Sequence, residues 1–324
     1  MYPAITLLGK TISSYGICSI IGGFFLALFC ALQCRFPRKK GGIVPDVQDM
    51  MLTLVFAVFG LLIGAKIMYA VTSTNFVYYE ELSFFANLWE WIKLLVGGGM
   101  VFYGGLIGAV AAGFIYIFHY KTPVSETIDI AFAGIPLFHA FGRIGCFMGG
   151  CCYGVEYHGI FAVTFPENNL GGAPANTEVL PIQLIESGLN LVLWAILFTV
   201  YRKSGRRWLT TGLYLCGYGI MRFVLEYFRG DLIRGHLGVL SSSQVISIVL
   251  ILIGVFLLIK PKFMDKTDEM NEKEYLLAVE QLNQKRAEYK KAVKERRNYN
   301  KEYAKEYISY LKAKISHSLK KGGM

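Results

Sequence analysis

The sequence predicts an all-α, polytopic membrane protein with seven transmembrane helices and a charged cytoplasmic C-terminal helix. Its 324 residues are 54% hydrophobic and only 17% charged, which is too apolar for an ordinary soluble domain. Seven apolar segments reach or approach the roughly 20 residues that cross a bilayer. After residue 260, sixteen Lys and Arg accompany ten Asp and Glu. We therefore expect a membrane domain over residues 1–260 and a cytoplasmic helical tail over residues 261–324.

The apolar segments define the expected spans, and the fourth is the weakest because it contains Asp129, Pro136, His139 and Arg143. The first segment is not expected to be a cleavable signal peptide, because its apolar stretch is too long and no small-residue cleavage site follows. The seven spans are Thr11–Leu32, Val47–Val71, Val96–His119, Thr127–Met148, Gln183–Tyr201, Leu209–Tyr227 and Ser243–Ile259.

Loop charges predict the orientation, because Lys and Arg accumulate in short cytoplasmic loops. The second loop is net acidic, and the fourth has no Lys or Arg. The alternation predicts an outside N-terminus and a cytoplasmic C-terminus. The sixth loop, with Arg229, Asp231 and Arg234, is an exception that suggests a site. The basic residues of the first, third and fifth loops are Arg35, Arg38, Lys39 and Lys40, then Lys121, then Arg202, Lys203, Arg206 and Arg207.

The stretch His139–Gly154, HAFGRIGCFMGGCCYG, is where we expect the chemistry, at the outer end of the fourth span. An arginine at membrane depth costs about 2.5 to 3.5 kcal/mol, so it is usually retained for a function. The planar guanidinium of Arg143 can form two parallel hydrogen bonds to a phosphate. A structural ion pair is the alternative interpretation of this residue. The glycines, Gly142 among them, favour close backbone approach, a ligand or helix packing, and the helix is expected to break near Gly149-Gly150.

Polar groups from other spans are expected at the same depth. Tyr103 could donate to a headgroup or accept a proton, or belong to an interfacial tyrosine belt. Arg222 and Glu226 share a helix face and can pair, while Arg229 could meet the same phosphate. Small residues at Gly104, Gly108 and Ala112 repeat every four positions, as in closely packed membrane helices. An amide and a carboxylate open the fifth span, Gln183 and Glu186.

Three cysteines in the central stretch, Cys146, Cys151 and Cys152, leave several interpretations open. They could form a disulfide, provide a reactive thiol, or pack as small apolar residues. Metal binding together with His139 or His158 fits no standard ligand spacing, so neither a metal nor a cofactor is predicted.

Several passages together resemble the phosphatidylglycerol-prolipoprotein diacylglyceryl transferase family over roughly Tyr15 to Ile259. The resemblance implies a seven-span enzyme of the bacterial inner (plasma) membrane with its site at the outer leaflet. Such enzymes move the diacylglyceryl group of phosphatidylglycerol to the lipobox cysteine next to a prolipoprotein signal peptide, a step of lipoprotein biosynthesis. The passages are GGGMVFYGGLIG, GRIGCFMGGCCYG, PIQLIES and RFVLEYFRGD followed by LG and SSSQ.

The resemblance implies roles for individual residues. Arg143 and Arg229 match the arginines that grip the headgroup, and Tyr15, Gly154 and the Gly104-Gly105 pair also match. Cys146 occupies a position of the family signature that has asparagine. The chain departs from the family pattern at five places. The family has histidine at the position of Tyr103, asparagine at Cys146, glutamate at Cys151, arginine at Lys66, and a proline between the positions of Arg229 and Asp231 that this chain lacks.

The implied reaction needs a thiolate, whereas an unperturbed thiol has a pKa of about 8.5. Arginines can stabilise the charge that builds on the leaving phosphate. Tyr103 is a poor base at neutral pH unless Arg143 lowers its pKa, and His139, one turn before Arg143, is a substitute candidate. A paralogue that binds anionic phospholipid or performs thiol chemistry without transfer is the alternative function.

The tail has apolar residues at four-three spacing on otherwise charged faces, which predicts a long helix. Self-association as a weak coiled coil, attraction to anionic lipid and a solvated helix without a partner are the three interpretations. No feature of the chain suggests nucleic-acid binding. The spaced residues are Tyr275, Val279, Leu282, Tyr289, Val293, Tyr303, Tyr307 and Tyr310.

Overall fold

A computed structural model describes residues 4–7, 10–38, 42–72, 78, 80–167, 169, 171–230, 236–237, 240–259 and 262–321. The residues Lys39, Lys40, Asp231 and Arg234, which entered the charge argument above, lie outside this set. The chain divides into two compact units, Met1–Glu272 and Lys273–Met324. The second unit belongs to a long helix, α9 (Lys262–Lys321), and the side chains of Leu282, Tyr303, Tyr307 and Tyr310 are not described.

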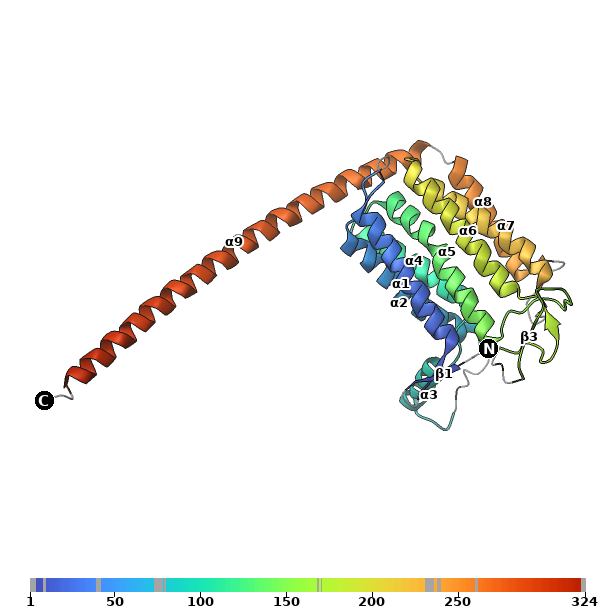
Figure 1. Ribbon diagram of the computed structural model, residues 1–324, viewed down its shortest axis with the longest axis horizontal. Helices are drawn as coiled ribbons and strands as arrows, with labels where there is room; N and C mark the ends of the chain where they lie inside the picture. The colour runs from blue at the N-terminus through green and yellow to red at the C-terminus, as the bar shows by residue number, and fades with distance from the viewer. Residues whose placement is uncertain are drawn as a thin grey trace. The chain divides into compact units, whose positions relative to one another are not determined.

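The first unit is a bundle of helices that run up and down side by side (Figure 1). Within it α2 packs against α4, α1 against α5, α5 against α6, and α7 against α8. Membrane spans are helical because in lipid every backbone polar group must be hydrogen-bonded within the segment itself. The helices are α1 (Ser14–Arg35), α2 (Val47–Thr72), α3 (Phe84–Gly97), α4 (Phe102–His119), α5 (Val124–Gly149), α6 (Ile182–Lys203), α7 (Leu209–Leu225) and α8 (Ser242–Ile259).

Six of the described helices, α1, α2, α4, α5, α6 and α8, are long and apolar enough to cross a membrane. The protein is thus a mostly helical, polytopic membrane protein, as predicted. The sixth expected span, Leu209–Tyr227, corresponds to α7, which has 17 residues and is followed by a three-residue 3-10 helix, η1 (Glu226–Phe228). The helix therefore tightens before the predicted end at Tyr227.

Two other boundaries differ from the sequence prediction. Residues from Thr11 to Ser13 belong to a β-hairpin, β1 (Ala4–Leu7) and β2 (Lys10–Ser13), so α1 begins later than expected. The third span begins at Phe102 because Gly97–Gly99 ends one helix before the next begins. The helix α3 was not predicted from the sequence. Its apolar residues are interrupted by Glu90 and Lys93, which form an ion pair at 2.8 Å.

The α2–α4 interface confirms the predicted close packing of small residues. A Cβ on Gly60 would lie 2.2 Å from the carbonyl oxygen of Gly108, and one on Gly108 would lie 2.1 Å from that of Gly60. One turn away, a Cβ on Gly104 would lie 2.4 Å from the carbonyl oxygen of Gly64. No side chain fits at these distances, so the two backbones touch directly.

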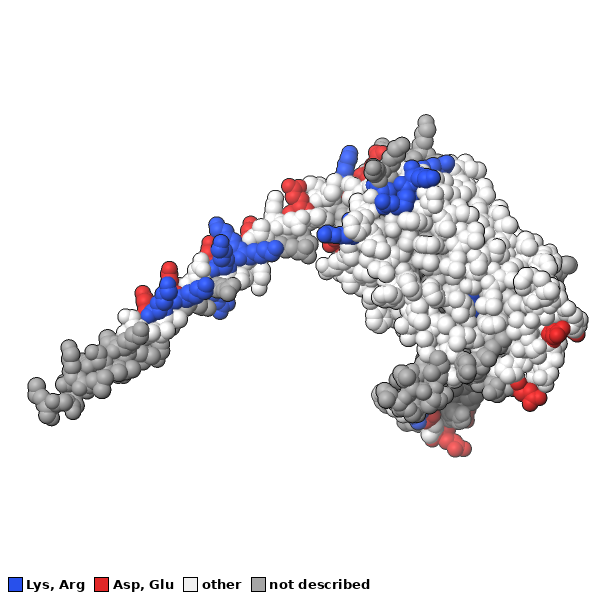
Figure 2. Space-filling model, viewed as in Figure 1, with Lys and Arg blue, Asp and Glu red and all other residues white. Residues whose placement is uncertain are grey.

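Charge separates the two ends of the bundle (Figure 2). Lys and Arg gather at one end, Asp and Glu lie at the end that carries α3 and β3 (Val163–Thr164), and the surface between them is almost uncharged. Such an uncharged belt matches the hydrocarbon core of a bilayer.

Candidate functional site

Arg143 lies in the last two turns of α5 and reaches toward α6. Its Nε is 2.9 Å from Oε1 of Glu186, and it also hydrogen-bonds to the hydroxyl of Tyr218 on α7. The Glu186 side chain is 2% exposed and that of Arg143 is 19% exposed, so the pair sits at the edge of the buried interior. The ion pair considered for Arg143 is therefore present, and it orients the guanidinium of a side chain that is still partly exposed.

The first turns of α6 fix the end of α5 and the loop that follows it. The buried Gln183 donates from Nε2 to the carbonyl oxygen of Cys151 at 2.8 Å. One turn later, the Ser187 hydroxyl donates to the carbonyl oxygen of Ala140 at 2.9 Å. These two bonds hold α5 and its loop in register with α6.

The helix α5 ends where the sequence predicted. Gly150 adopts the left-handed conformation with φ of 73°, which glycine tolerates without steric cost, and its N–H bonds back to the carbonyl oxygen of Phe147 at 3.2 Å. Cys152 also has a positive φ of 58°. For a non-glycine residue, that conformation costs about 1 kcal/mol or more of free energy. The chain therefore turns twice within three residues and brings its thiols back toward α5.

The loop after α5 is clamped between two other segments. The N–H of Val155 bonds to the carbonyl oxygen of Phe228 at 3.0 Å, and Gly154 forms an antiparallel bridge with Arg229. On the other side, the N–H of Leu180 bonds to the carbonyl oxygen of Val155 at 3.0 Å. A Cβ on Gly154 would lie 2.4 Å from the carbonyl oxygen of Leu180, so only glycine fits. This clamp carries Arg229 to the end of α5.

Three thiols converge beside the two arginines. The Sγ atoms of Cys146, Cys151 and Cys152 all lie within 4.8 Å of one another. Hydrogen bonds from Cys146 and Cys151, together with the charges of Arg229 and Arg143, lower the pKa of the Cys152 thiol. All seven cysteines lie in the described part of the chain, and none of them forms a disulfide there. The disulfide interpretation does not apply to this state.

The sequence that contains these arginines and cysteines is similar to a known protein family. A family model described as prolipoprotein diacylglyceryl transferase matches residues 3–260. The chain belongs to this family. It is 32% identical over 251 residues to phosphatidylglycerol–prolipoprotein diacylglyceryl transferase 2 of Clostridium perfringens, covering 78% of this chain and 91% of that protein. It is 31% identical to the enzyme of that name from Clostridium tetani, covering 77% and 93% of the two chains.

In this transferase-family protein, the first turn of α1 completes one wall of the site. Tyr15 is half exposed and lies close enough to Arg143, Cys146 and Cys151 to interact with them electrostatically. A Cβ on Gly145 would lie 3.0 Å from the Cα of Tyr15, so the glycine lets α1 and α5 approach at this level.

A second ion pair lies at the end of α7. Arg222 Nη2 is 2.7 Å from Glu226 Oε2 and also donates to the Ser243 hydroxyl at 2.9 Å. This confirms the predicted pairing at four-residue spacing. The pair links α7 to the start of α8 and thereby supports the segment that carries Arg229.

The remaining predicted site residues have varied surroundings. Tyr103 is at the first turn of α4, with its ring 39% exposed and packed edge-on against Phe102. Gly104 and its neighbour Gly105 face α2, and packing accounts for both. His139 has Nδ1 3.4 Å from the Tyr214 hydroxyl, and its ring is tilted against that of Tyr218 with the centroids 5.0 Å apart. Gly142 has open space where a Cβ would be.

Sequence reasoning missed Tyr218 and Ser187, which position Arg143 and α5. Tyr218 lies four residues before Arg222 and thus on the same face of α7, which is the signal that could have identified it. Ser187 lies one residue after Glu186 and carried no comparable signal.

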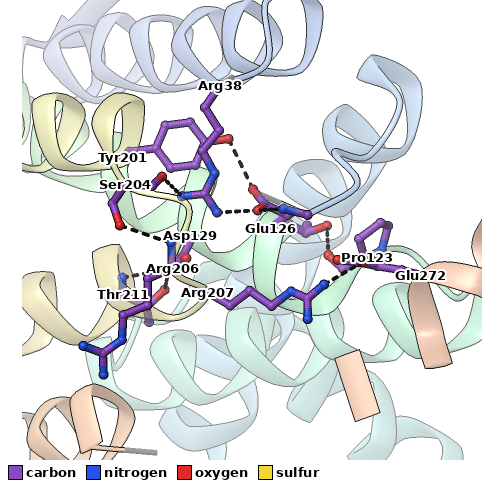
Figure 3. Close-up of polar contacts among 12 residues, drawn as sticks. Arg38, Pro123, Glu126, Asp129, Tyr201, Ser204, Arg206, Arg207, Thr211 and Glu272 are labelled. Atoms are coloured by element: carbon purple, nitrogen blue, oxygen red, sulfur yellow. Dashed lines mark hydrogen bonds and ion pairs between the residues drawn. The ribbon is translucent and has the colours of Figure 1, made fainter. Parts of the chain in front are cut away.

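A second buried polar network lies at the opposite end of α5 (Figure 3). Arg38 forms an ion pair with the fully buried Glu126 and lies over the ring of Tyr201, 4.6 Å from its centroid. Arg38 also donates to the carbonyl oxygen of Ser204 at 3.0 Å. One turn along α5, Asp129 accepts hydrogen bonds from the N–H and hydroxyl of Thr211 at 2.9 and 2.6 Å.

Proposed function

We propose that this protein transfers the diacylglyceryl group of phosphatidylglycerol to the lipobox cysteine of prolipoproteins in the bacterial inner membrane. The observation that carries the proposal is the convergence of Arg143 and Arg229 from α5 and the loop after α7, in a member of this family. Two guanidiniums at one place suit a phosphodiester better than any neutral ligand. The relatives' names favour transfer over the alternative of a lipid-binding or thiol-active paralogue.

In this proposal Arg143 and Arg229 bind the headgroup phosphate and stabilise the glycerol phosphate as it leaves. Glu186 and Gln183 keep Arg143 and the loop after α5 in position. Tyr15 and Gly142 border the lipid, while Gly154 and the Arg222–Glu226 pair hold Arg229 in place. Tyr103 and His139 remain proposed contacts of the substrate, at the entrance and one turn deeper.

We further propose seven spans, with α7 as the sixth in order. Together with η1 it comes close to the roughly 20 residues that a span needs. The N-terminus then faces outside, and the basic end of the bundle faces the cytoplasm, in agreement with the accumulation of Lys and Arg in cytoplasmic loops. The site at the end of α5 opens to the outer leaflet, where prolipoprotein signal peptides present their cysteine.

For the tail, residues 261–324, we propose a separate cytoplasmic helical domain. Its excess of positive charge supports attraction to anionic lipid, and the four-three spacing of its apolar residues supports self-association. Deleting residues 273–324 distinguishes this accessory role from a catalytic one, because transfer by the membrane domain should persist.

The decisive experiment is in vitro transfer. The purified chain in phosphatidylglycerol-containing nanodiscs is mixed with a precursor peptide that carries a lipobox cysteine, and the mass of the peptide is followed. We expect addition of one diacylglyceryl group and release of glycerol phosphate. A precursor with serine in place of the acceptor cysteine is the control. Absence of the mass increase with folded protein would reject the proposed function.

A further inference from the structure

The three-thiol cluster, Cys146, Cys151 and Cys152, has the ligand set of a metal site. Its Sγ atoms lie within 4.8 Å of one another, and three sulfurs bound tetrahedrally to zinc at about 2.3 Å would be about 3.8 Å apart. A contraction of about 1 Å closes that gap, which rotation of side chains in a loop can supply. Thiolate ligands select soft or borderline cations such as zinc and not magnesium or calcium.

The backbone around the three cysteines has a specific conformation that other residues hold in place. Cys146 is buried in the last turn of α5, and two left-handed residues, Gly150 and Cys152, return the chain toward it. Gln183, itself buried, fixes the carbonyl oxygen of Cys151 from α6. Simple packing of small apolar residues does not require a non-glycine residue at positive φ.

The electrostatics suit a zinc–thiolate centre. A zinc ion with three thiolates carries a single net negative charge, and Arg143 and Arg229 both lie close enough to Cys152 to interact with it. Three protein ligands also leave the fourth tetrahedral position open, as in catalytic zinc sites.

We propose that Cys146, Cys151 and Cys152 bind one zinc ion whose open position takes up the acceptor cysteine of the prolipoprotein. This inference rests on the proposed function and names the group that activates its thiol. On binding zinc, the acceptor thiol loses its proton to water, because a thiol that coordinates the metal is deprotonated. Its sulfur attacks the diacylglyceryl carbon next to the phosphate oxygen. The C–S bond forms, the C–O bond breaks, and its electron pair leaves with glycerol phosphate. The product thioether is neutral and releases the zinc.

The first test measures metal in the full-length protein in nanodiscs under reducing, anaerobic conditions. We expect one zinc per chain by elemental analysis, three sulfur neighbours by X-ray absorption, and thiolate-to-metal charge-transfer absorbance when cadmium replaces zinc. Cys152→Ser and the triple serine variant should lose that absorbance. Cys34→Ser and Cys216→Ser, outside the cluster, are matched controls that should keep it. Full absorbance in the triple variant, or no metal in the wild type, would overturn the site.

The second test follows transfer against pH, with and without zinc. A thiol of pKa about 8.5 is only a few per cent ionised at pH 7, so chelation should lower the rate about 10- to 30-fold there. The deficit should nearly vanish near pH 9.5, where about 90% of the acceptor ionises unaided, and added zinc should restore the rate at pH 7. A purely structural metal would give a deficit that is the same at every pH, which would overturn the activating role. Zinc bound with no transfer at any pH would instead reject the proposed function and leave the site standing.

Discussion

The two ends of α5 use the same residue types for opposite purposes. At one end, the Arg38–Glu126 pair is 1% and 0% exposed and is enclosed by Tyr201 and Ser204. At the other, Arg143 pairs with Glu186 but remains 19% exposed. A buried pair with its polar groups largely occupied can only support the fold, whereas a guanidinium oriented by one carboxylate at the edge can bind a further anion. Both arginines form ion pairs, so the ion pair does not separate the proposed binding residue from the structural one. The exposed fraction of the arginine side chain does.

Arg38→Ala should cause the largest loss of stability. It would leave Glu126 as an unpaired buried carboxylate, at a cost of about 3 to 5 kcal/mol. Denaturation of the purified protein in mixed micelles measures this loss. Glu126→Gln in the same background should recover part of it by removing the charge. Equal stability of wild type and Arg38→Ala would contradict the structural role of this end.

Arg143→Ala should cause the largest loss of activity. Removal of one group that stabilises a developing negative charge lowers kcat by about 10²- to 10³-fold. Stability should fall as well, because the Glu186 carboxylate is 2% exposed and would lose its ion-pair partner, so kcat is measured per folded protein. Arg143→Lys serves as the control, since it keeps the charge and loses the planar fork, and its rate should be intermediate. Unchanged transfer by Arg143→Ala would remove this residue from the site.

Thr211→Val tests the Arg38 end of α5 with a milder change. It removes the hydroxyl that donates to the buried Asp129 at 2.6 Å and leaves that carboxylate with the backbone N–H. The free energy of unfolding should fall by about 1 to 3 kcal/mol. Transfer by the folded fraction should stay at the wild-type rate, and a selective loss of rate would mean that the two ends are coupled.

Glu186→Gln should have the smallest effect of the four. Glutamine keeps the shape and an acceptor oxygen for Arg143 but loses the charge, so the guanidinium should be held less firmly. We expect about a tenfold lower kcat through misplacement of Arg143, with KM for the precursor peptide little changed. A rate equal to that of the wild type would show that Tyr218 alone suffices to orient Arg143.

Periodicity and composition predicted much of this molecule. Apolar segments located the membrane helices within a few residues, and the Gly104, Gly108 and Ala112 repeat correctly indicated the close contact with α2. Four-residue spacing predicted the Arg222–Glu226 pair. These features are local or repeat along one helix, so a linear pattern contains them.

Periodicity and composition could not predict the contacts between segments that are far apart in the chain. Nothing in the sequence shows that the segment around Gly154 lies between Leu180 and Phe228, because backbone hydrogen bonds between loops have no side-chain signature. The partner of Arg38 was equally hidden, since Glu126 is 88 residues away in the chain.

The sequence by itself determined that this is a helical membrane protein of the transferase family, and it singled out His139–Gly154 as the stretch where we propose the chemistry takes place. The tertiary structure decided which arginine is a structural residue and which is accessible, because burial depends on every helix around a side chain. It also decided that three cysteines form one cluster. Two left-handed turns bring them together, and ligand spacing along the chain does not reveal a fold of that kind.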